Sequence, residues 1–381
     1  MENILGQSHA IHLLQASLRS GRVHHAFIFH GPQGVGKFTT AVAFAGVLLC
    51  HKPRTSPAGE LERCGACPSC RYTTHPEGPQ NHPDLHVVRK ELAAVSSNAE
   101  LRKRKLMNIP IDLLRELVVG GTSQDRKFHE APAYLTPSLR HHKVFIIDEA
   151  ELLDKPGASA LLKTLEEPPT GTFLILVSEA EDKLLPTIRS RCQRVGFVPL
   201  EDDVIRHWVS QHNAGLSEQD QDRLVTIADG SFGRAKLALD YGLHEWAATI
   251  LPALDDMARG RFSPTLGAQL TEMIGGFASQ WVKDKDHPGA SKEAANRRAA
   301  SLVWSLIARH ARTRLHQTAA TCDPADPDAS WAKVARWLGV IEALRLAERE
   351  LKANLNVNLV CDHVVSLINR SLVGAPAFAG G

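Results

Sequence analysis

The sequence predicts an α/β domain followed by two helical domains, and three observations support this. The first 200 residues alternate apolar runs of strand length with segments of helical periodicity. From Glu201 onward the strand signal disappears and amphipathic helical segments follow one another. With 381 residues, the chain is also too long for one ordinary domain.

In the first domain, residues 1–200, strands and helices are expected in alternation. Apolar positions at helical spacing predict a helix over residues 4–20, and a short buried strand follows over residues 23–30. After a glycine-rich turn, a helix is expected from Phe38 to Leu49. Two continuous apolar runs rich in branched side chains are typical of strands buried on both faces of a parallel sheet, and they are residues 143–148 and 172–178.

The rest of the chain is expected to be helical. Short helices are predicted over residues 201–258, and the longer amphipathic helices are residues 262–281, 291–319 and 330–372. Pro, Gly and Asp predict loops at 283–290 and 321–329. The expected domains are residues 201–260 and 261–373, followed by a disordered tail at 374–381.

The overall charge is nearly balanced. The 44 basic and 42 acidic residues give a formal net charge of +2, whereas a protein that binds DNA tightly alone usually has a larger basic excess or a basic stripe. The one dense basic run, Arg102–Lys105, is expected to be a solvated loop, so any DNA contact is expected to be shared with other proteins. No secretory signal or bilayer-crossing stretch is found, so a cytoplasmic protein is expected.

Residues 31–37 have the pattern G-x-x-x-x-G-K between a predicted strand and a predicted helix, which is the context of a P-loop. Its glycines let backbone N–H groups turn towards a phosphate, and the helix N-terminus adds its positive end. Lys37 is expected to reach the outer phosphates, although a plain strand-to-helix turn also needs glycine. The predicted nucleotide-binding residues are Gly31, Gly34, Val35, Gly36, Lys37, Phe38, Thr39 and Asp148.

The position after Lys37 departs from this pattern. A hydroxyl normally follows the lysine and holds Mg²⁺, but Phe38 stands there. One step along a helix rotates a side chain by roughly 100°, so Thr39 does not simply replace the missing ligand. The pattern therefore favours binding of ATP or ADP with Mg²⁺ over efficient hydrolysis.

The second half of a nucleotide site is expected at residues 144–149, an apolar strand that ends in Asp148 and Glu149. This places Asp148 near Mg²⁺ and Glu149, as a catalytic residue, where it orients an attacking water. Acidic residues often end strands, so this pattern alone is a weak indication of a nucleotide site. It becomes a stronger indication because a P-loop precedes it in the chain. Glu149 favours hydrolysis whereas Phe38 opposes it, and the sequence leaves both outcomes open.

Four of the seven cysteines cluster at residues 50–70, with the spacing Cys50-x13-Cys64-x2-Cys67-x2-Cys70. Thiolates at two-residue gaps on a tight turn can converge on one tetrahedral Zn²⁺, and four sulfurs leave no open position. A structural zinc site is therefore predicted. Redox dithiol chemistry is the competing interpretation, but no thioredoxin-like context surrounds the cysteines.

A P-loop, four cysteines after its helix and a later Asp-Glu pair resemble the bacterial clamp-loader subunits of the AAA+ class. Residues 160–169 resemble the most recognisable stretch of that family, and Ser190-Arg191-Cys192 resembles its arginine-finger motif. The resemblance covers the first 240 residues well and the remainder loosely. It implies an AAA+ P-loop domain with a zinc module, a helical lid domain at 201–260 and a helical collar domain at 261–373. It also implies a catalytic role for Arg191 in trans, although on its residues alone Arg191 could simply form a salt bridge.

Within the family, three features resemble the delta-prime subunits more than the gamma/tau motor. They are Asn81-His82-Pro83-Asp84, the asparagine-rich segment at 354–359, and Phe38 in the P-loop. The motor also has a sensor arginine in its lid, whereas Arg234 lies one position late and is expected at the surface.

The resemblance implies a part in the DNA polymerase III holoenzyme, whose overall activity is that of a DNA-directed DNA polymerase, a nucleotidyltransferase. The implied partners are the delta and gamma/tau subunits, with the sliding clamp and primer–template DNA reached through the assembled complex, and no membrane. The alternatives are a gamma/tau-type motor that hydrolyses ATP itself, a stand-alone AAA+ DNA remodeller, and a zinc-stabilised scaffold with an inactive P-loop.

Overall fold

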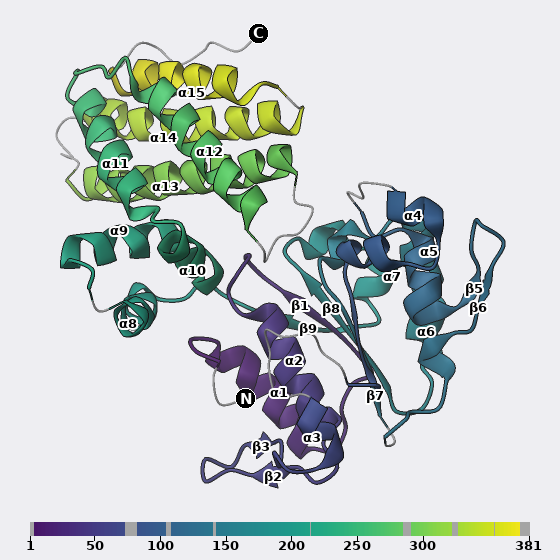
Figure 1. The fold of residues 1–381 in the computed structure, drawn as a ribbon. Coiled ribbons are helices and arrows are strands. Elements are labelled where there is room, and N and C mark those ends of the chain that lie inside the picture. Colours follow the sequence, from purple (N-terminus) through teal and green to yellow (C-terminus); the bar gives the residue numbers. More distant parts are fainter. Residues whose placement is uncertain are drawn as a thin grey trace. The chain divides into compact units, whose positions relative to one another are not determined.

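The structure of the protein is a computed structural model that describes residues 4–72, 82–103, 108–139, 142–213, 215–284, 291–321, 327–353 and 355–373. The chain forms two compact units, Met1–Leu200 and Glu201–Gly381 (Figure 1). The predicted tail at 374–381 lies outside the described residues, as do Asn81, Asn354 and residues 104–105 of the basic run. Within the described part of the chain, no helix is long and apolar enough to cross a bilayer.

The first unit is built on a parallel sheet of five strands in the order β4-β7-β8-β1-β9. The strands are β1 (Ala26–His30), β4 (Leu85–Val88), β7 (Lys143–Ile147), β8 (Thr172–Ser178) and β9 (Gln193–Gly196). The expected strands are present as β1, β7 and β8, and β1 begins three residues later than expected, at Ala26. The sequence does not predict the edge strands β4 and β9, because each has only four residues, with polar side chains among them.

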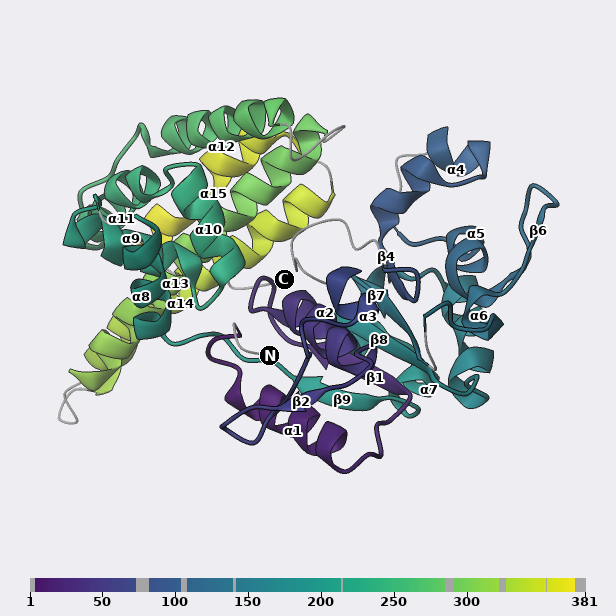
Figure 2. The same ribbon diagram turned by 60° about the horizontal axis from the view of Figure 1, so that its bottom comes forward.

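Helices cover both faces of this sheet (Figures 1 and 2). One face packs against α1 (Ser8–Arg19) and α2 (Lys37–Leu48), and the other against α5 (Ile111–Leu114), α6 (Lys155–Glu166) and α7 (Pro186–Arg189). Successive strand residues point to opposite faces, so Phe27 and Phe29 join the first core whereas Ala26 and Ile28 join the second. This double burial explains why the central strands are continuous apolar runs.

Shorter elements complete the first unit. They are two small hairpins, β2 (Arg54–Thr55) with β3 (Leu61–Glu62) and β5 (Gly121–Thr122) with β6 (Phe128–His129), the helices α3 (Pro68–Tyr72) and α4 (Ala99–Lys103), the π-turn η2 (Arg115–Val119), and the 3₁₀ turns η1 (Lys90–Val95), η3 (Pro132–Tyr134), η4 (Ala150–Leu152) and η5 (Glu181–Lys183).

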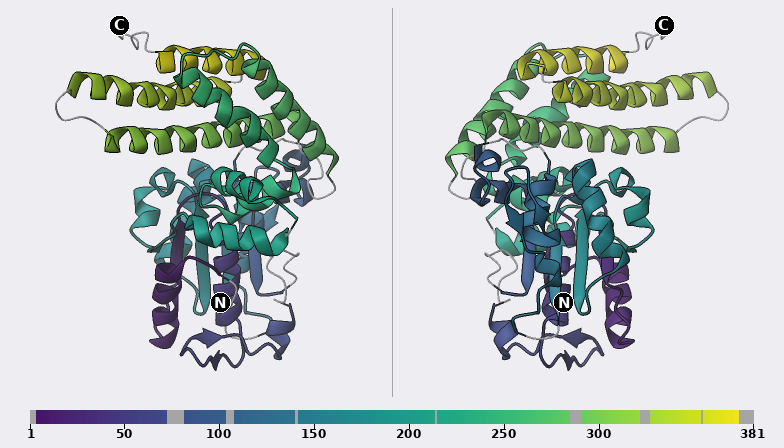
Figure 3. Two further views of the ribbon diagram at one scale, coloured as in Figure 1. Left: turned by 90° about the vertical axis from the view of Figure 1, so that its left-hand side faces the viewer. Right: turned by 90° about the vertical axis from the view of Figure 1, so that its right-hand side faces the viewer.

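In the second unit, helices are the only regular elements among the described residues. Its helices are α8 (Asp202–His212), α9 (Glu218–Ala228), α10 (Phe232–Asp240), α11 (His244–Ala258), α12 (Leu266–Lys283), α13 (Lys292–Ala320), α14 (Pro327–Lys352) and α15 (Val357–Val373). Helices α12–α15 form a bundle in which α12 contacts α13 and α15, and α14 contacts the same two helices (Figure 3). The division into lid and collar at residue 260 stays a prediction, since α11 contacts α9 and also α12, α13 and α15.

The helix expected over 330–372 is two helices, α14 and α15, and the sequence-based expectation is wrong at this point. Just before α15, the Asn356 side-chain oxygen accepts a hydrogen bond of 2.9 Å from the backbone N–H of Asn358. Asparagine favours such local bonds over a continuous helix, and here the bond satisfies an N–H group that the start of α15 would leave without a partner.

Candidate functional site

The P-loop joins β1 to α2 at the carboxyl end of the central strands. Three of its glycines, Gly31, Gly34 and Gly36, have φ values of 143°, 72° and 98°, which side chains with a Cβ rarely adopt. At Gly31 a Cβ would also lie 2.2 Å from the carbonyl oxygen of Phe197. The glycine pattern is therefore required by the backbone path of this loop.

Gln7 ties the loop to the chain after β9. Its side-chain nitrogen donates to the carbonyl oxygens of Val35 (3.3 Å) and Val198 (2.7 Å), and its oxygen accepts from the Val198 N–H (3.2 Å). Gln7 is 2% exposed. This buried amide therefore links the backbone of the P-loop to the backbone that follows β9.

Lys37 is folded back onto the loop itself. Its ammonium group donates to the carbonyl oxygens of Gly31 (2.7 Å) and Pro32 (2.5 Å), and the residue is 5% exposed. Burial lowers the pKa of Lys37, and the carboxylates of Glu179, Glu151 and Asp148 act in the opposite direction. The ammonium group thus closes the loop on itself through two of the loop's own carbonyl oxygens.

Phe38 lies at the start of α2 beneath an arginine that follows β4. The Arg89 guanidinium carbon is 4.1 Å from the centre of the Phe38 ring, and Arg89 Nε donates to Asp148 Oδ2 at 3.1 Å. The other oxygen of Asp148 accepts from the Glu149 N–H at 3.1 Å. Burial raises the pKa of Asp148, while Arg89 and the Glu149 N–H act to lower it. Phe38, Arg89 and Asp148 therefore form one stacked and ion-paired group.

Glu149 is also paired with a basic residue, Lys90, which follows Arg89 in the sequence. Lys90 Nζ lies 2.9 Å from Glu149 Oε1 and 2.6 Å from Oε2. Glu149 has a positive φ of 51°, a left-handed conformation that is costly for a residue other than glycine. The side chain predicted to orient a water thus has a cation on both of its oxygens.

These contacts do not suit the Mg²⁺ ion expected from the sequence. Phe38 provides no oxygen, both oxygens of Asp148 already accept hydrogen bonds, and Thr39 is exposed. The hydroxyl of Thr40 donates to the carbonyl oxygen of Gly36 at 2.8 Å. Neither of the two positions expected to hold Mg²⁺, Phe38 and Asp148, therefore offers it an oxygen without a hydrogen bond.

The four predicted zinc ligands, by contrast, lie together. The sulfurs of Cys50, Cys64, Cys67 and Cys70 are all within 4.8 Å of one another, and Cys70 Sγ is 3.6 Å from Cys50 Sγ and 3.9 Å from Cys64 Sγ. A tetrahedral Zn²⁺ with Zn–S bonds of about 2.3 Å separates its sulfurs by about 3.8 Å. The donor set fits a structural zinc ion.

The backbone around the cysteines favours thiolates at one end of the cluster. N–H groups of Ala66 and Cys67 lower the pKa of Cys64 to about 6, whereas burial raises the pKa of Cys50 and of Cys70. Cys50 ends the segment after α2, and the other three come from the turn after β3 and from α3. The cluster therefore joins the P-loop helix to the β2–β3 hairpin.

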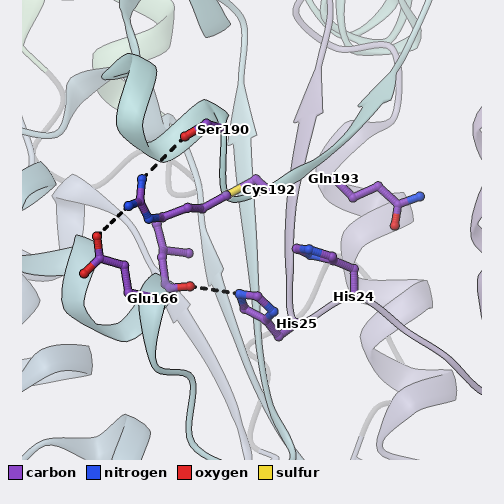
Figure 4. A pocket seen from close by; sticks show the side chains of 8 residues that line it. His24, His25, Glu166, Ser190, Cys192 and Gln193 are labelled. Atoms are coloured by element: carbon purple, nitrogen blue, oxygen red, sulfur yellow. Dashed lines mark hydrogen bonds and ion pairs between the residues drawn. The ribbon is translucent and has the colours of Figure 1, made fainter.

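Arg191 borders a separate cavity of about 420 Å³ beyond α7 (Figure 4). Its Nη2 lies 2.7 Å from Glu166 Oε1 at the end of α6, and its Nη1 donates to the carbonyl oxygen of Thr187 at 3.0 Å. The side chain of Arg191 is 35% exposed. Burial raises the pKa of the neighbouring Cys192 to about 12, which favours the protonated thiol at neutral pH.

Two histidines just before β1, His24 and His25, form the other wall of this cavity. His25 Nε2 lies 3.0 Å from the carbonyl oxygen of Leu165, and its ring stacks on that of His24 (Figure 4). Burial lowers the pKa of His25. The cavity thus presents one arginine, two stacked histidine rings and a glutamate that pairs with the arginine.

Three of these residues are not found by sequence reasoning. Arg89 and Lys90 come 59 residues before their acidic partners, and only the pairing of β4 with β7 brings them together. A pair of basic residues directly after the short segment Leu85–Val88 is the one local signal. Glu166 belongs to the recognised stretch at 160–169, but its contact with Arg191 depends on the packing of α6 against α7.

In the second unit, Arg234 is 3.6 Å from Asp229.

A glycine-rich loop on a central parallel strand, with an Asp-Glu pair after β7, defines an α/β domain of the P-loop class. Together with the helical second unit, it fits an AAA+ fold. The family model described as "DNA polymerase III, delta subunit" matches residues 6–201. The chain belongs to this family of DNA polymerase III clamp-loader subunits.

Relatives of two kinds are similar to the chain. The DNA polymerase III subunit gamma/tau of Mycobacterium tuberculosis (strain ATCC 25618 / H37Rv) is 34% identical over 195 residues, 51% of this chain and 28% of that protein. The subunit delta' of Bacillus subtilis (strain 168) is 31% identical over 55% of this chain and 54% of its own length. The subunit delta' of Pseudomonas aeruginosa is 29% identical over 62% of each chain. The matches thus span 28% to 62% of the length of these relatives, in each case less than two thirds.

Among solved structures, a gamma subunit-related protein from Thermotoga maritima is similar with a TM-score of 0.41 and 16% identity, covering 94% of this chain and 99% of that one.

Proposed function

We propose that this chain is a delta-prime-type subunit of the bacterial clamp loader, which supports ATP-dependent loading of the sliding clamp without hydrolysing ATP itself. The observation that carries the proposal is the neutralised nucleotide site. Asp148 is paired with Arg89 above Phe38, and Glu149 is paired with Lys90. A subunit with this site contributes to hydrolysis through what it offers to a neighbour.

The group it offers is Arg191, as an arginine finger for ATP bound by an adjacent subunit. A guanidinium that reaches a transferring phosphoryl group stabilises its developing charge. Arg191 is partly exposed and held by a single carboxylate, that of Glu166, which is 50% exposed. An exposed ion pair of this kind is worth at most about 1 kcal/mol, so a γ-phosphate can compete for the arginine.

Zinc and the helical unit have structural roles in this proposal. The four cysteines hold one Zn²⁺ that links α2 to the β2–β3 hairpin, and the helices α12–α15 serve as the collar that joins the delta and gamma/tau subunits. Contacts with the clamp and with primer–template DNA belong to the assembled complex, in the cytoplasm. The balanced net charge of +2 supports shared DNA contacts.

The second candidate is a gamma/tau-type motor, and the retained Lys37 and Glu149 favour it. The two functions differ in the turnover of the isolated chain. A delta-prime-type subunit shows negligible ATP hydrolysis alone, whereas a motor shows turnover that Lys37→Ala abolishes.

Reconstitution tests the proposed function. The chain is mixed with the delta and gamma/tau subunits of its own organism, the complex is sized by light scattering, and clamp loading is measured on primed DNA. We expect one stable complex whose loading activity depends on this chain. Failure to enter the complex, or unchanged loading when the chain is omitted, would contradict the assignment.

A further inference from the structure

The position that Mg²⁺ takes in a complete P-loop site is taken by protein side chains in this chain. In a complete site Mg²⁺ stands between the loop hydroxyl and the strand-end aspartate. Here a phenylalanine ring replaces the hydroxyl and a guanidinium group stands over it, bonded to that aspartate. Arg89 thus bridges the two positions, Phe38 and Asp148, that would otherwise share the metal.

Phe38 and Arg89 support each other at this position. The ring gives the guanidinium a flat apolar surface at 4.1 Å, a distance at which a cation–π contact is favourable. Asp148 also holds the guanidinium group of Arg89, because its Oδ2 accepts a hydrogen bond from Arg89 Nε. A threonine at position 38 would remove the surface that holds Arg89 in place.

Arg89 also has N–H groups that remain available as hydrogen-bond donors. Its Nε donates to Asp148, and within the described residues its two Nη groups make no hydrogen bond. The side chain is 42% exposed. Planar guanidinium groups bind phosphate oxygens with two parallel N–H bonds, a geometry that a lysine cannot offer.

We propose that Arg89 takes the place of the divalent cation at this P-loop, so that the chain binds the phosphates of a nucleoside di- or triphosphate without Mg²⁺. Lys37 and the loop N–H groups hold one side of the phosphate chain, and the Nη groups of Arg89 hold the side that normally faces the metal. The proposal rests on the proposed function only in treating the loop as a nucleotide site. It is tested on the isolated full-length chain, so its failure leaves the reconstitution result untouched.

Binding of ADP and of ATP is measured by calorimetry, once with EDTA and once with MgCl₂. We expect the same dissociation constant in both buffers within a few-fold. Because charge-assisted bonds are lost, Arg89→Ala is expected to weaken binding in EDTA by about 10- to 100-fold. Binding that requires Mg²⁺, or no binding in either buffer, would overturn the proposal.

A matched variant controls for the loss of an exposed arginine. Arg206 on α8 is also paired with an aspartate, Asp222, and its side chain is 43% exposed, close to the 42% of Arg89. Arg206→Ala is expected to leave nucleotide binding unchanged, and an equal loss in both variants would overturn the assignment to Arg89. Thermal melts confirm that each variant is folded.

The double variant Phe38→Thr with Arg89→Ala tests the exchange of cation for arginine directly. It restores a hydroxyl and releases Asp148, so its nucleotide binding is expected to become stronger in MgCl₂ than in EDTA by about tenfold or more. Phe38→Thr alone is expected to gain less, because Arg89 still engages Asp148. A double variant whose binding stays indifferent to Mg²⁺ counts against the proposal.

Discussion

Gln7 shows how much one buried side chain can hold in this fold. Its amide satisfies the backbone of Val35 in the P-loop and both backbone groups of Val198. Removing it leaves buried polar groups without partners, each of which costs about 1–3 kcal/mol. The residue therefore couples the shape of the P-loop to the end of the sheet.

We expect Gln7→Ala to lower the free energy of unfolding by about 1–3 kcal/mol in urea titration. Gln7→Glu is expected to be at least as harmful, because a carboxylate cannot donate to the carbonyl oxygens of Val35 and Val198. Gln211→Ala, at an exposed site on α8, serves as the control and is expected to stay within about 0.5 kcal/mol. Equal stabilities for the Gln7 and Gln211 variants would show that the buried amide is dispensable.

At the scale of residues, the sequence predicts groups that are close in the chain better than groups that are distant. The loop glycines, Lys37 and the four cysteines carry their spacing in the sequence itself. The partner of Asp148 does not, because Arg89 reaches it only through the pairing of two parallel strands. Such pairs are set by topology, and a single sequence contains no signal for them beyond the residue types.

Among the elements, the cysteine cluster has the clearest energetic consequence. It ties α2 to a hairpin of two-residue strands and to the five-residue helix α3, and neither is long enough to be stable alone. Metal binding is therefore expected to supply much of the folding free energy of this segment.

We expect elemental analysis to find one zinc per chain, and Cys64→Ser or Cys67→Ser to lose it together with a fall in melting temperature. Cys192→Ser is the control, since that thiol lies outside the cluster, and it is expected to keep the zinc. Zinc affinity is expected to fall as the pH falls, because the raised pKa values of Cys50 and Cys70 mean that both must release protons to bind. A metal-free protein whose Cys64→Ser variant melts at the same temperature would argue for reduced, unligated cysteines.

Elements also differ in how far the sequence reveals them. Central strands and long helices are evident because burial on two faces or along one stripe imposes a long pattern. The edge strands β4 and β9 are four residues each, and their existence depends on neighbouring strands. The break between α14 and α15 depends on Asn356 capping, which competes with a helical pattern that continues on both sides.

At the scale of the whole molecule, the proposed function gives the chain two separate sites. One is its own P-loop site, and the other is Arg191, which acts on ATP bound by a neighbouring subunit. The first site has its carboxylates paired with basic residues, and the second consists of Arg191 held by Glu166. If both assignments hold, hydrolysis by the assembled loader depends on Arg191 and not on Glu149 of this chain.

We therefore expect Arg191→Ala to leave folding, zinc content and nucleotide binding by the chain intact, and to leave entry into the complex unchanged. The DNA- and clamp-stimulated ATPase of the assembled loader is expected to fall by about tenfold or more, because the arginine stabilises charge that develops only in the transition state. Arg191→Lys is expected to rescue poorly, since an ammonium group lacks the planar fork of guanidinium. Steady-state hydrolysis and clamp loading are measured with wild-type partners.

Two further variants separate a finger from an ordinary surface ion pair. Arg194 is three residues away and is paired with Glu181, so Arg194→Ala removes another arginine–glutamate pair from the same segment and is expected to leave loading unchanged. Glu166→Gln removes the carboxylate that holds Arg191. If the pair matters only for stability, Glu166→Gln and Arg191→Ala should have the same small effect on loading. If Arg191 acts on a neighbour's γ-phosphate, Glu166→Gln keeps the arginine and most of the ATPase, whereas Arg191→Ala loses it. Full activity of Arg191→Ala in both assays would leave this arginine as a surface residue whose only partners are those of its own chain.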